Sequence, residues 1–147
     1  MSQLERAIAQ AVKTHAGQED KAGDPYILHP LRVMLSLSSE DERIVGVLHD
    51  VVEDGDVSFS DLEKMDFSPV VVEALKSVTK RPEEEGSDAG YQAFVERAGA
   101  NPVARSVKKA DLLDNLDVTR LETVREKDAQ RLCKYLRALR YLDSLET

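Results

Sequence analysis

Apolar residues recur along most of the chain at helical spacing. Leu4, Ile8, Ala11 and Val12 follow the i, i+4, i+7, i+8 pattern of a helix with one buried face, which predicts a helix over residues 3–16. The same spacing, read between proline, glycine and serine positions, predicts helices over residues 30–38, 41–54, 59–65, 69–79, 89–99, 102–118 and 128–145. Because no segment alternates convincingly with the period of two of a strand, the pattern predicts an all-α fold.

Polar segments separate the predicted helices. Residues 16–25 contain two glycines and a proline and predict a loop. Residues 82–88 predict a second, insertion-tolerant loop, in which the acidic run from Glu83 to Glu85 is solvated. In the last predicted helix, Cys133 lies on an apolar stripe and is expected in the core, while Tyr135 and Tyr141 fit either the core or a contact between copies of the chain.

Composition narrows the class of protein. At 147 residues, the chain predicts a single domain, 1–147, with 41% hydrophobic residues for its core. No apolar run approaches the roughly 20 residues that span a bilayer, so we expect no membrane association. The first residues lack the order of a signal peptide, and Cys133 as the one cysteine allows no internal disulfide, which together predict a cytoplasmic protein.

The formal net charge of −8 disfavours nucleic-acid binding, which depends on neutralising phosphates. A small phosphorylated ligand remains compatible with this charge if a local group of basic residues or a metal ion offsets it.

The segment from residue 48 to residue 54 has the composition of a metal site. Within one helix over 41–54, His49, Asp50, Glu53 and Asp54 would fall within roughly 140° of one face. Ionisable groups in so apolar a stretch are costly unless something pairs with them. Glu53 and Asp54 at the end of a helix also oppose its macrodipole, which favours a functional reason for them over a structural one.

Two other segments supply further donors. His29 begins the second predicted helix, and Asp111 lies among apolar residues of a later one, so the candidate ligands are His29, His49, Asp50 and Asp111. This N2O2 set suits Mn, Fe, Zn or Ni better than Mg or Ca. A metal held there would lower the pKa of a water molecule and orient its attack on phosphorus, with the two acidic residues near enough to move protons. His15 is expected to be structural.

Four motifs in fixed order resemble the HD-type hydrolase domain of the RelA/SpoT family. They read HAGQ at residues 15–18, GDPYILHP at 23–30, LHDVVED at 48–54 and VKKADLLDN at 107–115. The resemblance covers roughly residues 7–120, and at this length the chain is similar to the small stand-alone alarmone hydrolases, without the synthetase and regulatory domains of long members.

The resemblance implies an HD fold that holds Mn²⁺ and hydrolyses the 3′-pyrophosphate of guanosine tetra- or pentaphosphate. It implies His29, His49, Asp50 and Asp111 as metal ligands, Glu53 and Asp54 as the catalytic acidic pair, and Lys21 and Asn115 as nucleotide contacts. Lys108 shares a helix face with Asp111, so it is either a substrate contact or the ion-pair partner of that carboxylate.

Two segments depart from the family pattern. Asp20 stands where the family has a basic residue beside Lys21, and Asp117 and Val118 follow where a basic residue and a threonine are usual. These positions leave open the hydrolysis of another nucleotide or phosphorylated cofactor. Two other classes also stay open: alarmone binding without catalysis, and an acidic interaction protein with a vestigial site.

Overall fold

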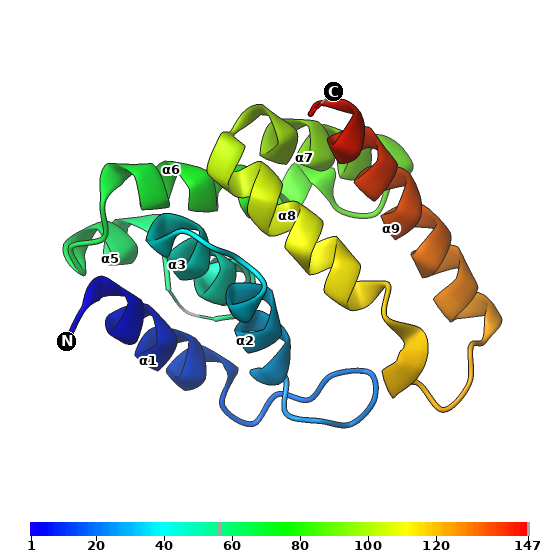
Figure 1. Cartoon of the computed structure of the whole chain (residues 1–147), viewed down its shortest axis with the longest axis horizontal. Coiled ribbons are helices and arrows are strands. Elements are labelled where there is room, and N and C mark those ends of the chain that lie inside the picture. Colours follow the sequence, from blue (N-terminus) through cyan, green and yellow to red (C-terminus); the bar gives the residue numbers. More distant parts are fainter. Residues whose placement is uncertain (56, 147) are drawn as a thin grey trace.

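The structure is a computed structural model that describes residues 1–55 and 57–146. The described residues form helices joined by short loops and include no strand, which confirms the all-α prediction (Figure 1). The helices are α1 (Gln3–His15), α2 (Leu28–Leu35), α3 (Glu40–Leu48), α4 (Val51–Asp54), α5 (Phe59–Lys64), α6 (Pro69–Val78), α7 (Asp88–Ala100), α8 (Pro102–Asn115) and α9 (Glu126–Ser144), with 3₁₀ turns η1 (Pro82–Glu84) and η2 (Val118–Arg120). None of these described helices is both long and apolar enough to cross a membrane.

Local sequence explains where most helices begin. Three of them start with a capping box, in which a serine side chain accepts from the N3 amide and the N3 carboxylate accepts from the serine amide: Ser2 with Glu5, Ser39 with Glu42, and Ser58 with Asp61. Helices α6 and α8 begin instead with a proline in the first turn, where the missing N–H costs nothing.

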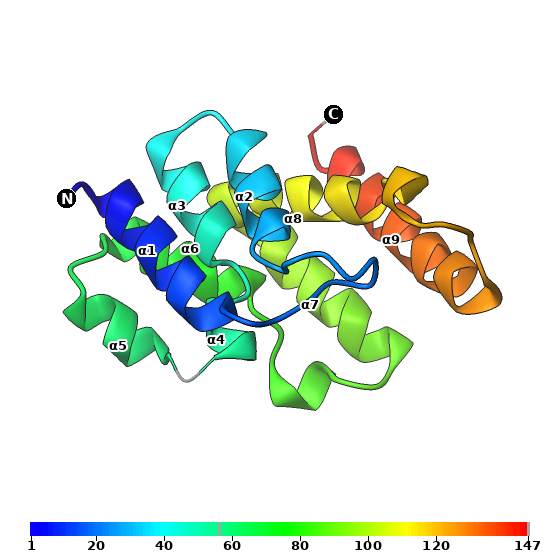
Figure 2. The ribbon, with the colours of Figure 1, turned by 90° about the horizontal axis from the view of Figure 1, so that it is seen from below.

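Helix α3 is the central element of the fold. It packs against α1, α2, α6 and α8, and its residues Ile44, Val45, Val47 and Leu48 are almost completely buried. Helices α2 and α8 also contact each other, so the three helices that carry candidate metal ligands meet along one seam (Figures 1 and 2). A smaller apolar cluster joins α7, α8 and α9 beyond that seam.

The predicted helix over residues 41–54 is wrong in one respect, because it is broken at His49 and Asp50. Helix α3 ends at Leu48, and Asp50 adopts φ −107° and ψ 2°, outside the helical region, before the single turn of α4 begins. The four ionisable residues of this segment therefore do not share one helix face. The predicted helix over 102–118 also ends early, at Asn115, and is followed by η2.

The prediction that Cys133 lies in the core is wrong, since its side chain is exposed. Helix α9 packs only along a narrow face against α7 and α8, and its buried residues are Ala138, Leu139 and Leu142. The apolar stripe in the first half of α9 extends past the end of that contact, which sequence periodicity does not reveal.

The prediction of a solvated acidic run in the loop before α7 is wrong for its central residue. Glu84 is only 7% exposed, and its two carboxylate oxygens accept from the guanidinium of Arg97 on α7. Arg97 also donates to the carbonyl of Thr79 at 2.7 Å, so this ion pair attaches the loop to the ends of both α6 and α7. The guanidinium lowers the pKa of Glu84.

Glu84→Ala should destabilise the protein by about 2 kcal/mol, because it leaves a partly buried guanidinium without its carboxylate. Urea unfolding followed by circular dichroism measures the change. The neighbouring exposed residue provides the control, and Glu83→Ala should change stability by less than about 0.5 kcal/mol. Equal losses in the two variants would contradict the assigned role of the ion pair.

Candidate metal and phosphate site

Three buried donor groups from three helices converge where α2, α3 and α8 meet. His29 belongs to α2, His49 follows the last residue of α3, and Asp111 belongs to α8. The Nε2 atom of His29 lies 2.9 Å from Oδ1 of Asp111 and 3.3 Å from Nε2 of His49, whose Nε2 lies 3.4 Å from the same oxygen. All three ligand atoms lie within 4.8 Å of one another.

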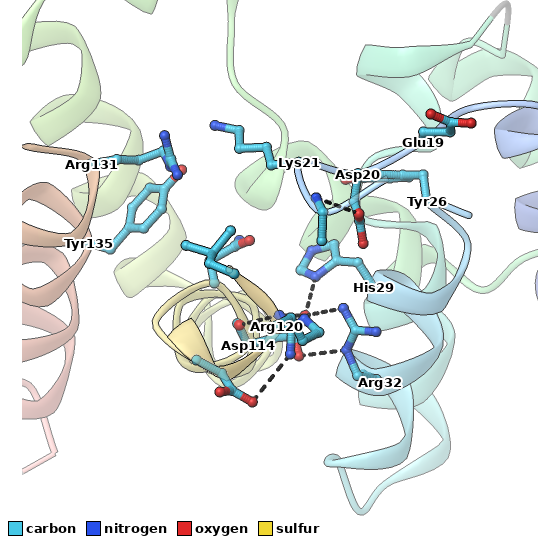
Figure 3. Close-up of a pocket in the computed structure, with 14 residues that line it drawn as sticks. Glu19, Asp20, Lys21, Tyr26, His29, Arg32, Asp114, Arg120, Arg131 and Tyr135 are labelled. Atoms are coloured by element: carbon cyan, nitrogen blue, oxygen red, sulfur yellow. Dashed lines mark hydrogen bonds and ion pairs between the residues drawn. The ribbon is translucent and has the colours of Figure 1, made fainter. Parts of the chain in front are cut away.

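A carboxylate and an arginine orient His29. Its Nδ1 donates to Oδ2 of Asp114 at 2.6 Å, and Arg32 holds that carboxylate through its Nε at 2.8 Å (Figure 3). The proton on Nδ1 leaves Nε2 of the neutral imidazole with a lone pair that faces Asp111. Burial opposes this arrangement of charges, but the hydrogen bonds of His29 and Arg32 keep the pKa of Asp114 below its usual value.

A backbone carbonyl orients His49 in the same way. Its Nδ1 donates to the carbonyl of Gly46 at 2.6 Å, so its Nε2 also presents a lone pair toward the cluster. That Nε2 lies 3.1 Å from Oδ2 of Asp50. A hydrogen bond on the distal nitrogen is the usual support of a histidine that binds a metal ion.

With both Nδ1 protons engaged elsewhere, the Nε2 lone pairs of His29 and His49 face each other and the Asp111 carboxylate with no donor between them. Neutral His29 and His49 direct unprotonated nitrogens at each other and at Asp111, an arrangement that only a proton or a metal cation relieves. Although burial disfavours charged imidazoles, the carboxylates of Asp50 and Asp111 raise the pKa of His49 well above its usual value. The residues thus fit a divalent cation in both donor chemistry and electrostatics.

Asp50 borders this three-residue group. Its Oδ2 contacts His49 and accepts a hydrogen bond from the hydroxyl of Tyr26. Burial works against ionisation of Asp50, but the charge of His49 outweighs it and lowers the pKa of Asp50. The structure thus brings the predicted donors His29, His49, Asp50 and Asp111 to one place, while their role as ligands stays a prediction.

Two side chains of α8 donate hydrogen bonds to the carboxylate of Asp111. Lys108 donates to Oδ2 at 2.9 Å and Asn115 donates to Oδ1 at 3.0 Å. Lys108 is only 7% exposed and its Nζ lies 4.7 Å from the centre of the Phe94 ring. Burial disfavours the ammonium, but Asp111 raises the pKa of Lys108 above its usual value. Of the two roles that the sequence leaves open for Lys108, the contacts show the ion pair.

Glu53 and Asp54 lie on α4, on the far side of the break from His49. Burial and the negative charge of Asp50 raise the pKa of Glu53 to about 7, and the same two causes raise the pKa of Asp54. Both carboxylates line open grooves beside α1 and α6 and do not line the cavity next to His29.

A cavity of about 300 Å³ opens beside His29, between the loop after α1 and helices α8 and α9. Arg131 and Tyr135 face it from α9, His29, Asp114 and Arg32 lie on the other side, and Lys21 extends between them from the loop after α1 (Figure 3). Asn115, a predicted nucleotide contact, lines it as well. Partial burial and the like charge of Arg131 lower the pKa of Lys21.

Sequence reasoning assigned no site role to four residues that the structure places here: Arg32, Asp114, Arg131 and Tyr135. Arg32 follows His29 by three positions and Asp114 follows Asp111 by three, so helical spacing alone puts each on the face of a candidate ligand. Arg131 and Tyr135 come from α9, and nothing in the local sequence connects that helix with the histidines.

The helices form an all-α domain in which His29, His49 and Asp111 make a buried group with the donor atoms to hold a metal ion. No family model matches the chain. A GTP pyrophosphokinase of Streptomyces coelicolor is 34% identical over 128 residues, which are 82% of this chain and 15% of that protein. A guanosine-3′,5′-bis(diphosphate) 3′-pyrophosphohydrolase of Drosophila melanogaster is 36% identical over 105 residues, 67% of this chain and 58% of that protein.

A solved structure of a metazoan SpoT ortholog that hydrolyses ppGpp has a TM-score of 0.77 and 27% identity, and covers 99% of this chain and 94% of its own. In sequence and fold the chain therefore belongs with the HD-type (p)ppGpp hydrolase domains. The chain spans 15% to 20% of the length of three curated relatives, among them the Streptomyces coelicolor protein.

Asp114→Asn should weaken divalent-cation binding by about tenfold to a hundredfold, because it removes the charge that orients His29 through its distal nitrogen. Titration calorimetry with Mn²⁺ and Zn²⁺ measures this affinity. Asp117→Asn is the matched control, since Asp117 lies three residues further on, is exposed and contacts neither histidine. An unchanged affinity in Asp114→Asn would remove the proposed support of His29.

Proposed function

We propose that this protein is a divalent-metal-dependent phosphohydrolase that removes pyrophosphate from the 3′ position of guanosine tetraphosphate. The observation that carries the proposal is the set of converging lone pairs on His29, His49 and Asp111 beside a cavity with basic residues. The names of the relatives, among them 3′-pyrophosphohydrolases of Aquifex aeolicus and Drosophila melanogaster, support the same substrate.

In this proposal, the metal is held by His29, His49, Asp50 and Asp111. A bound divalent cation supplies positive charge that activates water and neutralises phosphate oxygens. Mn²⁺ suits two imidazoles and two carboxylates, and we propose it as the physiological ion. Lys108 and Asn115 hold the Asp111 carboxylate in place, and Asp114 holds His29, so the donor atoms are positioned before the ion binds.

Glu53 and Asp54 serve as the proton-transferring pair. The raised pKa of Glu53, about 7, allows it to accept and release a proton near neutral pH. A cation at the nearby cluster would offset the charge of Asp50 and bring this pKa down, which favours the base form in the loaded enzyme. The pair would then take the proton of the attacking water and return one to the leaving group.

The cavity beside His29 is the proposed nucleotide site. Lys21 and Arg131 offer positive charge for phosphate, Tyr135 offers a ring face, and Asn115 offers an amide. Arg32 pairs with Asp114 and Arg131 pairs with Asp128, so a phosphate would share either guanidinium with a carboxylate.

The two acidic departures from the family pattern are compatible with this assignment. Asp20 accepts from the amides of Ala22 and Asp24 at 2.9 and 3.0 Å, so it shapes the loop that carries Lys21. Asp117 accepts from the amide of Thr119 and pairs with Arg120. Both carboxylates are thus engaged locally, which reduces their repulsion of a polyphosphate.

The remaining sequence predictions belong to this proposal. We propose a single cytoplasmic domain that acts on a small-molecule nucleotide, does not bind nucleic acid or membrane, and has the capacity to form a homo-oligomer.

The wild-type protein with Mn²⁺ should release pyrophosphate from guanosine tetraphosphate, and Asp50→Ala should lower kcat/KM by about a thousandfold, since several kcal/mol of charge stabilisation depend on the bound ion. A coupled pyrophosphate assay measures both. Asp88→Ala, at an exposed position on α7, controls for a general loss of acidic charge. If the wild type binds Mn²⁺ but is inactive toward guanosine tetraphosphate, the substrate assignment is overturned. A panel of other nucleotides and phosphorylated cofactors would then be tested.

Lys21→Ala should raise KM by about tenfold with kcat little changed, because a charged hydrogen bond to the bound phosphate is lost.

Lys108→Met should leave KM unchanged and lower stability by about 3 kcal/mol, because it removes the ammonium that pairs with the buried carboxylate of Asp111. Steady-state kinetics and urea unfolding separate the two effects. A raised KM in Lys108→Met would show that Lys108 contacts the substrate after all.

A further inference from the structure

The end of α1 contains a buried histidine nitrogen that the proposed function does not use. His15 is only 2% exposed, and its Nε2 has no hydrogen-bond partner. Its Nδ1 lies 2.9 Å from Oε1 of Gln18, and its ring lies 4.9 Å from that of Tyr26, whose hydroxyl binds Asp50. His15 and Gln18 thus lie next to the cluster without belonging to it.

The hydrogen bonds of Gln18 determine the tautomer of His15. The Nε2 amide of Gln18 is 3.3 Å from the carbonyl of Thr14 and 3.3 Å from the carbonyl of Asp54. Because both groups are acceptors, the amide nitrogen must face them, and Oε1 must face His15. His15 therefore donates from Nδ1, and Gln18 uses its whole amide to join the end of α1 to the end of α4.

The sequence allows this close approach at two glycines. Gly17 has φ +81°, a left-handed conformation that turns the chain so that Gln18 folds back on α1. At Gly55, a Cβ atom would lie 2.5 Å from Cγ2 of Thr14, so a larger residue would push α4 away from α1. This close approach of α4 to α1 accompanies the 3.3 Å contact between Gln18 and the carbonyl of Asp54.

Helix α4 needs such an anchor. It has only four residues, follows the break at Asp50, and cannot be stable as an isolated turn. Its main helix partner in the described chain is α1. Burial and Asp50 raise the pKa of Asp54, and among the three histidines His15 has the largest opposing influence on it.

We propose that His15 and Gln18 form a clasp that positions α4, and with it Glu53 and Asp54, relative to the metal cluster. His15 and Gln18 are positioning residues in this proposal, because they act through the backbone of Asp54 and touch no substrate. The catalytic part of the inference rests on the proposed function, whereas the anchoring of α4 does not.

The first test is amide hydrogen exchange of the protein without added metal, read in the peptide that covers residues 51–55. Gln18→Leu should speed exchange there by about tenfold, because the tie to Asp54 is lost, with little change in the exchange of α3 and α8. Gln10→Leu is the matched control: Gln10 also lies on α1 and donates to Thr14, at 3.0 Å, but it makes no hydrogen bond to α4. Unchanged exchange in Gln18→Leu would overturn the clasp, whether or not the wild type is a hydrolase.

The second test compares two replacements of His15. His15→Asn places an amide N–H close to the position of Nδ1. It should leave the amide hydrogen exchange of residues 51–55 at the wild-type rate and retain most of kcat. His15→Gln places its amide closer to Nε2, loses the donor to Gln18, and should lower kcat by about tenfold to a hundredfold at unchanged KM and Mn²⁺ affinity. Because both variants remove the same ring, equal effects would assign His15 a packing role and overturn the proposal.

Gln18→Glu provides a second route in case Gln18→Leu folds poorly. It preserves the acceptor for His15 but sets a carboxylate oxygen against the carbonyls of Thr14 and Asp54, so it should loosen α4 as Gln18→Leu does. In an active wild type, faster exchange with unchanged kcat would show that the clasp holds α4 without positioning the acidic pair.

Discussion

The buried carboxylate of Asp111 is the charge on which the rest of this structure depends. An ionised carboxylate between packed helices is unfavourable unless every lone pair is matched. Here Lys108 and Asn115 match it from its own helix, and His29 and His49 approach it from two others. Burial opposes its ionisation, but Lys108 and the two histidines keep the pKa of Asp111 well below its usual value. The same contacts join α2, α3 and α8. The residues of the candidate metal site therefore also hold the centre of the fold together.

The break between α3 and α4 divides the chemistry into two faces. His49 and Asp50 sit at the break and face the cluster, whereas Glu53 and Asp54 continue on a separate turn that borders other grooves. A continuous helix would place all four on one arc, with their charges crowded together. The break instead directs His49 and Asp50 toward the cluster and leaves Glu53 and Asp54 accessible to solvent, provided that an outside contact holds the short α4 in place.

Local patterns accounted for most of the fold. Capping serines, prolines in first turns and apolar spacing predicted the bounds of α1, α5, α6, α7 and α9 to within two residues, because each of these signals is local and acts within one turn. The predicted ends of α2 and α8 lie three residues too far along the chain, and α3 and α4 were predicted as one helix. The exceptions are places where a distant segment overrides the local preference. Glu84 is buried because Arg97 reaches it, and Cys133 is exposed because α9 has a partner along only one narrow face.

The sequence by itself determined the all-α class and the residues able to bind a metal, since apolar spacing, buried carboxylates and histidines are properties of residue types and their order. Only the tertiary structure decided how those residues are used. It assigned Lys108 to Asp111, placed Asp114 behind His29, brought Arg131 and Tyr135 across from Lys21, and turned His15 toward α4. Spacing along the chain placed Lys108 and Asp114 on the face of Asp111, but which partner each side chain meets depends on packing between helices, which spacing does not encode.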